Sequence, residues 1–123
     1  MQSKTILVVD DSNVLLKTVK ESLESKGFHV ITALNGPEAI TKLKKSKVDL
    51  ALIDIIMPGM SGFDLTAKIR EDKRLKKLKI AFLTILNFSK NQRESLRKYN
   101  ILDYIQKPFD NKDLINRVKK MVA

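Results

Sequence analysis

The sequence contains no cysteine and no tryptophan, and it has only one histidine. Without cysteine, the chain cannot form disulfide bonds, thiolate zinc sites or a cysteine nucleophile. Long uncharged runs are also missing, because Asp54 interrupts the longest one and a membrane helix needs about 18 apolar residues. Residues 1–4 lead straight into a predicted strand, without the apolar core of roughly 7 to 15 residues found in secretory signals. We therefore expect a cytoplasmic protein without membrane insertion.

The composition is strongly basic, with 24 Lys and Arg against 14 Asp and Glu and a formal net charge of +10. Clustered basic residues would suggest nucleic-acid binding, because they neutralise phosphates and release counterions. Here the lysines are spread along the chain, arginines are few, and aromatic residues do not alternate with them. We therefore predict a solvated, lysine-rich surface and no nucleic-acid partner. The 123 residues, 43% of them hydrophobic, are predicted to form one domain, residues 1–123.

Short apolar segments alternate with segments of helical period. Strands are predicted near 6–9, 28–33, 49–54, 80–84 and 104–106, and a helix follows each one. The first helix is predicted from Ser12 to Lys26, stopped by Gly27, with a buried face of Val14, Leu15, Val19 and Leu23. The other four helices are indicated by Pro37 in a first turn, by Leu65 with Ile69, by a capping box at 89–92 and by Asp110 as a cap. The predicted buried positions of the second and last helices are Ala39, Ile40, Leu43, Leu114, Val118 and Met121. Such alternation indicates an α/β fold with a parallel sheet and helices on both faces.

Polar residues end four of the apolar runs. Asp10 and Asp11 follow the first strand, Asp54 follows the third, and Thr84 and Lys107 close the last two. The carboxyl ends of parallel strands share one edge of an open α/β sheet, where ligands bind. We therefore expect three carboxylates, a hydroxyl and an ammonium around one small pocket.

Three carboxylates in one pocket need a compensating cation. At separations of about 4 Å they repel by roughly 4 kcal/mol per pair, at an effective dielectric constant near 20. Lys107 supplies one positive charge, and the remaining excess favours a divalent ion. An oxygen-only ligand set suits Mg²⁺. The alternative for Asp10 or Asp11 alone is that it merely caps the first helix.

The reactive group follows by elimination. A serine or threonine nucleophile needs a neighbouring base, but His29 is predicted at the opposite edge of the sheet, where it is an ordinary strand residue. A carboxylate is already ionised at neutral pH and can attack phosphorus directly. Asp54, which ends a central strand, is the best placed, with Thr84 and Lys107 able to hold phosphoryl oxygens.

The sequence resembles a response-regulator receiver domain over essentially its whole length. The resemblance is carried by four motifs in order, each closing a strand: Val8-Val9-Asp10-Asp11-Ser12, the segment 54–62 with Met57-Pro58-Gly59, Leu83-Thr84, and Lys107-Pro108-Phe109. It implies a flavodoxin-like (βα)5 doubly wound fold with five strands in the order 2-1-3-4-5 and helices on both faces.

The resemblance also implies roles for individual residues. Asp54 would accept a phosphoryl group from the phosphohistidine of a histidine kinase, and Thr84 and Lys107 would bind the phosphoryl oxygens. Mg²⁺ would be held by Asp10, Asp11, Asp54 and the backbone carbonyl of Ile56. The peptide bond between Lys107 and Pro108 would be cis. Tyr104 matches the aromatic switch position, and the alternative is a strand aromatic packed on a neighbour.

Phosphorylation would then act through charge. The added negative charge would draw Thr84 and Lys107 inward, Tyr104 would follow, and the outer surface of the fourth helix, fifth strand and fifth helix would change shape. The implied partners are a sensor histidine kinase or phosphotransfer protein and a downstream protein target. No output domain follows residue 123, so we expect a stand-alone messenger or relay intermediate, in chemotaxis or another pathway, unless the sequence is a fragment.

Three residues depart from the family pattern. Ile85 is bulky where receivers commonly have a small residue, and Ile56 and Leu86 are apolar at positions that tune hydrolysis in the family. We therefore expect a long-lived phosphoryl group. Two other functions stay open. One is a phosphorylation-independent docking module. The other is a phosphohydrolase, although Asp54-Ile55-Ile56 lacks the second acid that such enzymes commonly use, and we do not expect a turnover enzyme.

Overall fold

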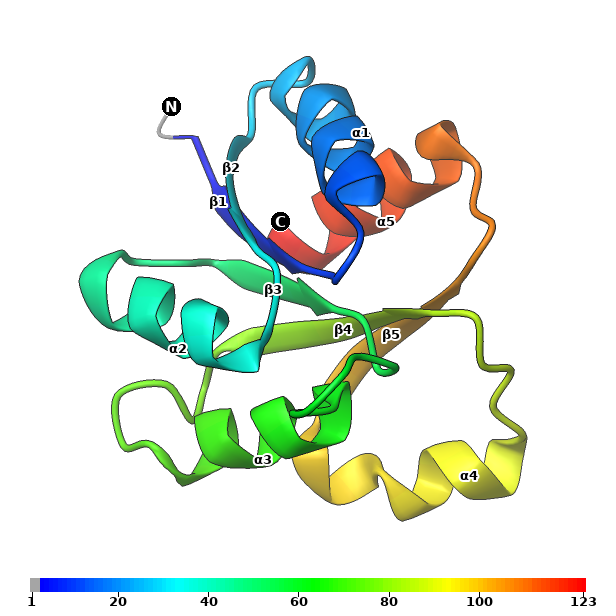
Figure 1. Cartoon of the computed structure of the whole chain (residues 1–123). Coiled ribbons are helices and arrows are strands. Elements are labelled where there is room, and N and C mark those ends of the chain that lie inside the picture. Colours follow the sequence, from blue (N-terminus) through cyan, green and yellow to red (C-terminus); the bar gives the residue numbers. More distant parts are fainter. Residues whose placement is uncertain (1–2) are drawn as a thin grey trace.

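A computed structural model describes residues 3–123. Five parallel strands form one sheet in the order β2-β1-β3-β4-β5 (Figure 1). Their bounds are β1 Thr5–Val9, β2 His29–Ala33, β3 Leu50–Ile53, β4 Lys79–Thr84 and β5 Ile101–Gln106. The predicted strand order is confirmed.

The five predicted helices are present, with one added 3-10 turn. They are α1 Asn13–Glu24, α2 Gly36–Lys45, α3 Gly62–Glu71, α4 Lys90–Ser95 and α5 Asn111–Val122, and the 3-10 turn η1 spans Arg97–Tyr99. Each α-helix begins after a residue whose side chain accepts a backbone N–H of the first turn: Ser12, Asn35, Ser61, Ser89 and Asp110. The predicted capping box at Ser89 and Gln92 is confirmed. Among the described helices, none is long and apolar enough to cross a bilayer.

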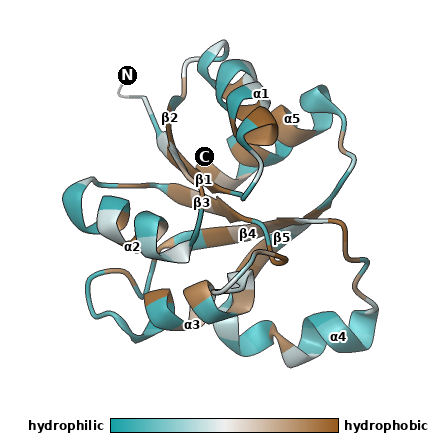
Figure 2. Cartoon of the chain, in the orientation of Figure 1, coloured by the Kyte–Doolittle hydropathy of each residue, from teal (hydrophilic) through white to brown (hydrophobic). Residues whose placement is uncertain are grey.

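The sheet divides the hydrophobic core into two halves. On one face, α1 and α5 pack against alternate strand residues such as Ile6 and Leu52. On the other face, α2 and α3 cover the intervening positions, such as Leu7 and Ile53. Figure 2 shows the hydrophobic sheet between helices whose outer surfaces are hydrophilic. Because both faces are covered, the strands need no polar alternation.

Two details of the predicted helices were wrong. Val14 lies in the first turn of α1 with 78% of its surface exposed, and Leu16 is buried in its place. Burial at 16, 19 and 23 is the spacing of one helix face. The helix ends at Glu24, and the chain then turns through Gly27, whose φ is 91°. In α5, Met121 is partly buried and packs against the core as predicted, and Val122 is buried as well.

Candidate functional site

Backbone pairing carries the predicted site residues to one edge of the sheet. The N–H of Asp54 donates to the carbonyl of Val9 at 2.9 Å, and the N–H of Lys107 donates to the carbonyl of Thr84 at 2.7 Å. Asp10 is held in the same way beyond the end of β1. The backbone pairing therefore continues past the strand ends. The carboxyl ends of β1, β3, β4 and β5 lie at one edge of the sheet (Figure 1), so the polar residues that follow these strands lie at that edge too.

The structure brings the three predicted carboxylates together. One oxygen from each of Asp10, Asp11 and Asp54 lies within 4.8 Å of the others, with Asp10 and Asp54 buried and Asp11 exposed. Asp10 Oδ1 accepts the N–H of Ser12 at 2.9 Å, but the cap of α1 is Ser12 itself. Helix capping therefore does not account for the position of Asp10.

Lys107 supplies the positive charge of the site. Its Nζ lies 2.6 Å from Asp10 Oδ2 and 3.4 Å from Asp54 Oδ2, and its side chain is 17% exposed. The peptide bond to Pro108 is cis, as the family resemblance implied. One ammonium thus faces two buried carboxylates, and the cluster keeps an excess of negative charge.

Burial raises the pKa of Asp54 above its ordinary value. The charge of Lys107 lowers that pKa, and the neighbouring Asp10 raises it again. The N–H of Ile56, 3.4 Å from Asp54 Oδ1, also lowers it. The pKa of Asp54 is raised on balance, so the contacts with Lys107 and Ile56 do not fully offset the cost of burying the charged carboxylate.

The donor set fits a magnesium ion. Mg²⁺ prefers hard oxygen ligands at about 2.0 to 2.1 Å and commonly takes only one or two carboxylates with several waters. The three carboxylate oxygens lie close enough to share one such ion after small side-chain movements. The backbone of Ile56 lies beside Asp54, where its carbonyl was predicted to serve as a further ligand.

Thr84 is buried at the end of β4. Its Oγ1 accepts the N–H of Leu86 at 3.1 Å, and no hydrogen bond from this hydroxyl to a carboxylate is present among residues 3–123. Thr84 is therefore at the predicted edge but is engaged with the loop that follows β4.

Gly62 packs closely against the backbone of Asp54 and Ile55, a contact that the sequence reasoning missed. A Cβ atom at this position would lie 2.5 Å from the carbonyl oxygen of Asp54 and 2.7 Å from the Cα of Ile55. The N–H of Gly62 also donates to the carbonyl of Ile55 at 2.8 Å. Only glycine allows α3 to start this close to the acidic residue. The available signal was the glycine that ends the segment 54–62.

Tyr104 lies outside the carboxylate cluster, in an aromatic cluster of its own. Its ring centroid is 5.7 Å from that of Phe82 and 5.1 Å from that of Phe88, and the Arg93 guanidinium carbon lies 4.8 Å from the ring centroid. Phe63 touches both phenylalanines and closes the group. The packing alternative is thus observed, while the switch role stays a prediction. Sequence reasoning did not anticipate Phe88 or Arg93 as partners.

A family model described as "Response regulator receiver domain" matches residues 6–119. The chain belongs to this family. A "Probable transcriptional regulator ycf29" of Porphyra purpurea is 36% identical over 122 residues, 98% of this chain and 57% of that protein. The chain spans about half the length of curated relatives such as this one.

Solved receiver structures match almost the whole chain. The chemotaxis protein CheY4 of Vibrio cholerae has a TM-score of 0.89 at 28% identity, covering 98% of this chain and 99% of that one. The response regulator TrrA of Thermotoga maritima, solved in complex with Mg²⁺-BeF, has a TM-score of 0.80 at 37% identity, covering 96% and 98%. Receiver domains are phosphorylation-activated switch modules of two-component signalling rather than enzymes that turn over external substrates.

Proposed function

We propose that Asp54 of this receiver domain accepts a phosphoryl group from the phosphohistidine of a sensor kinase or phosphotransfer protein. An Asp54 carboxylate oxygen attacks phosphorus, a P–O bond forms, and the P–N bond breaks with its electron pair returning to the donor imidazole. The observation that carries the proposal is the Lys107 ammonium, 3.4 Å from Asp54 Oδ2 inside a carboxylate cluster. It stands where charge on a transferred phosphoryl group would need stabilisation.

The hydrogen bonds favour Asp54 over the other two carboxylates as acceptor. Asp10 uses one oxygen for the N–H of Ser12 and the other for the ammonium of Lys107. Asp11 is the exposed member of the cluster. Asp54 directly follows the central strand β3, and its contacts with the Ile56 N–H and the Lys107 ammonium, at 3.4 Å each, are longer than those of Asp10.

Mg²⁺ is proposed as the metal, held by Asp10, Asp11, Asp54 and the backbone carbonyl of Ile56. When bound, it would supply the positive charge that the cluster lacks and would balance the oxygens of the incoming phosphoryl group. The relative TrrA, solved with Mg²⁺-BeF, supports this assignment by analogy.

The proposed output is a shape change on the face formed by α4, β5 and α5. A phosphoryl group brings close to two negative charges, which give Thr84 and Lys107 a new partner. Thr84 is hydrogen-bonded to Leu86 in the β4–α4 loop, so its movement would pull on that loop. A cavity of about 290 Å³ lies on this face, lined in part by Arg93, Tyr104 and Arg117, and could present different shapes to a downstream protein.

The test is intact-mass measurement after incubation with acetyl phosphate and Mg²⁺. We expect a gain of one phosphoryl group, which is lost in Asp54→Asn and in the presence of a chelator. Asp113→Asn, which changes an exposed aspartate of α5, is the matched control and should still gain the group. No gain in the wild type would indicate a docking module, and rapid turnover of many donors would indicate a phosphohydrolase.

A further inference from the structure

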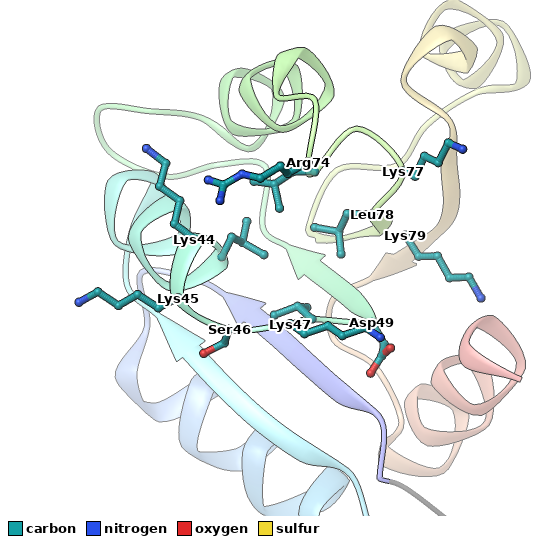
Figure 3. Close-up of a pocket in the computed structure, with 12 residues that line it drawn as sticks. Lys44, Lys45, Ser46, Lys47, Asp49, Arg74, Lys77, Leu78 and Lys79 are labelled. Atoms are coloured by element: carbon teal, nitrogen blue, oxygen red, sulfur yellow. The ribbon is translucent and has the colours of Figure 1, made fainter.

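A second cavity, of about 540 Å³, lies where the chain enters β3 and β4, at the edge of the sheet opposite Asp54, which follows β3. Figure 3 shows the side chains that line it. It is formed where residues 43–49, at the end of α2, meet residues 74–79, which lead into β4. Six basic side chains line it: Lys44, Lys45, Lys47, Arg74, Lys77 and Lys79. The lysines that looked dispersed in the sequence therefore gather in part at one place.

The positive charge around this cavity is not neutralised by ion pairs within the part of the chain that the structure describes. Among residues 3–123, none of the six basic side chains forms an ion pair within 4.0 Å. Among the described lining residues, only Asp49 is acidic, and its Oδ2 accepts the N–H of Thr5 at 2.8 Å. Lys79 Nζ donates to the carbonyl of Met121 at 2.8 Å instead. The rim is thus available to an anionic partner.

Helix stabilisation explains only part of this cluster. Lys44 and Lys45 lie in the last turn of α2, where cations are favoured by the helix dipole. Lys47 lies beyond that helix, and Arg74 and Lys77 belong to the connector before β4. None of these three residues belongs to the last turn of a helix, where the helix-dipole effect is concentrated.

The cavity has an aliphatic floor beneath its basic rim. Leu43 is buried, and Val48, Leu75 and Leu78 are partly buried in the same half of the core. In Figure 3, Lys45 and Lys77 point to opposite sides, so the cations do not converge on one point. A single phosphate would therefore meet few of them, whereas an extended ligand could meet several.

We infer that this surface docks an acidic protein segment that also carries aliphatic side chains. Carboxylates would pair with the basic rim, and leucine-like side chains would cover the floor. Nucleic acid fits less well, because the described residues that line the cavity include no aromatic side chain for base stacking. A flat anionic bilayer could touch the rim but not fill the recessed floor. Since the cavity lies at the opposite edge from Asp54, docking should not depend on phosphorylation.

The test measures binding of a labelled peptide by fluorescence anisotropy. The peptide consists mostly of Glu and Asp around two leucines, and its length of about twelve residues is enough to span such a pocket when extended. A second peptide of equal charge replaces both leucines with asparagine. We expect the leucine peptide to bind several-fold more tightly, and its binding to weaken with added salt because exposed charges are screened. Equal affinity for the two peptides would overturn the role of the floor.

The protein variants test the rim. Lys44→Glu, Lys47→Glu and Lys77→Glu together should weaken binding of the leucine peptide by at least about tenfold, because each reversal replaces attraction to the acidic peptide with repulsion. The matched control reverses three exposed lysines that do not line the cavity: Lys17, Lys20 and Lys90. Equal losses in the two triple variants would mean that only net charge matters and would overturn the proposal.

Two further measurements separate this docking from other binding. An RNA oligonucleotide or anionic vesicles that bind more tightly than the leucine peptide, and lose binding only in the rim variant, would overturn the peptide assignment. The rim variant should still take up a phosphoryl group from acetyl phosphate, and Asp54→Asn should still bind the peptide. Failure of the docking proposal is thus distinguishable from failure of the phosphoacceptor proposal.

Discussion

Replacing Lys107 with methionine should destabilise the protein in metal-free buffer and increase its response to Mg²⁺. The ammonium lies 2.6 Å from Asp10 Oδ2 and 3.4 Å from Asp54 Oδ2. At an effective dielectric constant near 20, these distances correspond to gross attractions of about 6 and about 5 kcal/mol. Much of this is offset by the cost of removing three charged groups from water.

Removing one partner of a buried ion pair commonly costs about 3 to 5 kcal/mol, because a charge is left buried without compensation. The Asp54 carboxylate, whose pKa burial already raises, can recover part of that cost by taking up a proton. We therefore expect Lys107→Met to lower the free energy of unfolding by about 3 kcal/mol at neutral pH in EDTA, measured by urea denaturation. Lys20→Met, at an exposed position of α1, should change it by less than about 0.5 kcal/mol.

Mg²⁺ provides the second half of this test. In the wild type, the proposed Mg²⁺ would compete for the same two carboxylates that the Lys107 ammonium contacts. In Lys107→Met that competition is gone, so millimolar Mg²⁺ should raise the free energy of unfolding more than it does in the wild type. A variant as stable as the wild type in EDTA, or one with a smaller response to Mg²⁺, would refute the view that Lys107 compensates the acidic cluster.

Three further predictions concern other parts of the molecule. The double variant Ile56→Asn, Leu86→Glu should shorten the lifetime of the phosphoryl group several-fold. Both side chains are exposed, by 49% and 37%, and their replacements would be able to orient water. Slower loss of the added mass than in the wild type would contradict this. Arg70→Met should lower the free energy of unfolding by about 2 kcal/mol in urea, because the guanidinium donates to the carbonyls of residues 76, 78, 99 and 100; a loss below about 0.5 kcal/mol would argue against it. The hydrogen bond from the Lys42 side chain is the main cause that lowers the pKa of Glu38, followed by the hydrogen bond from the Leu34 N–H. Glu38→Gln should therefore lower the free energy of unfolding by about 0.3 to 0.5 kcal/mol at pH 7. This stabilisation exists above the unfolded pKa and is lost as the pH falls through the lowered folded pKa, so the difference in urea midpoint should vanish at low pH, and a difference that grows there would contradict it.

The fold and most of the acidic site follow from local signals in the sequence. Asp10, Asp54 and Thr84 each come directly after buried apolar residues, so their place at the end of a strand could be predicted without knowing the neighbours. Parallel pairing then brings them together. The prediction for Val14 failed because the exact start of a helix decides which side of its first turn faces the core.

Features that depend on distant segments could not be predicted in this way. The close contact at Gly62 depends on how near α3 comes to the backbone that follows β3. The partners of Tyr104 come from β4, the β4–α4 loop and α4. The basic cavity arises because two lysine-rich segments about 30 residues apart become neighbours when β3 and β4 pair. Their charge alone gave no sign of that meeting.

The attachment of α4 has a consequence for how the molecule fluctuates. This helix has six residues and no buried side chain, while α1 and α5 each bury several residues. A segment with so little apolar contact opens locally at low free-energy cost, without unfolding the rest of the domain. Amide hydrogens of α4 should therefore exchange with deuterium far sooner than those of α1 and α5. A binding partner could thus change the conformation of α4 at a lower free-energy cost than that of α1 or α5.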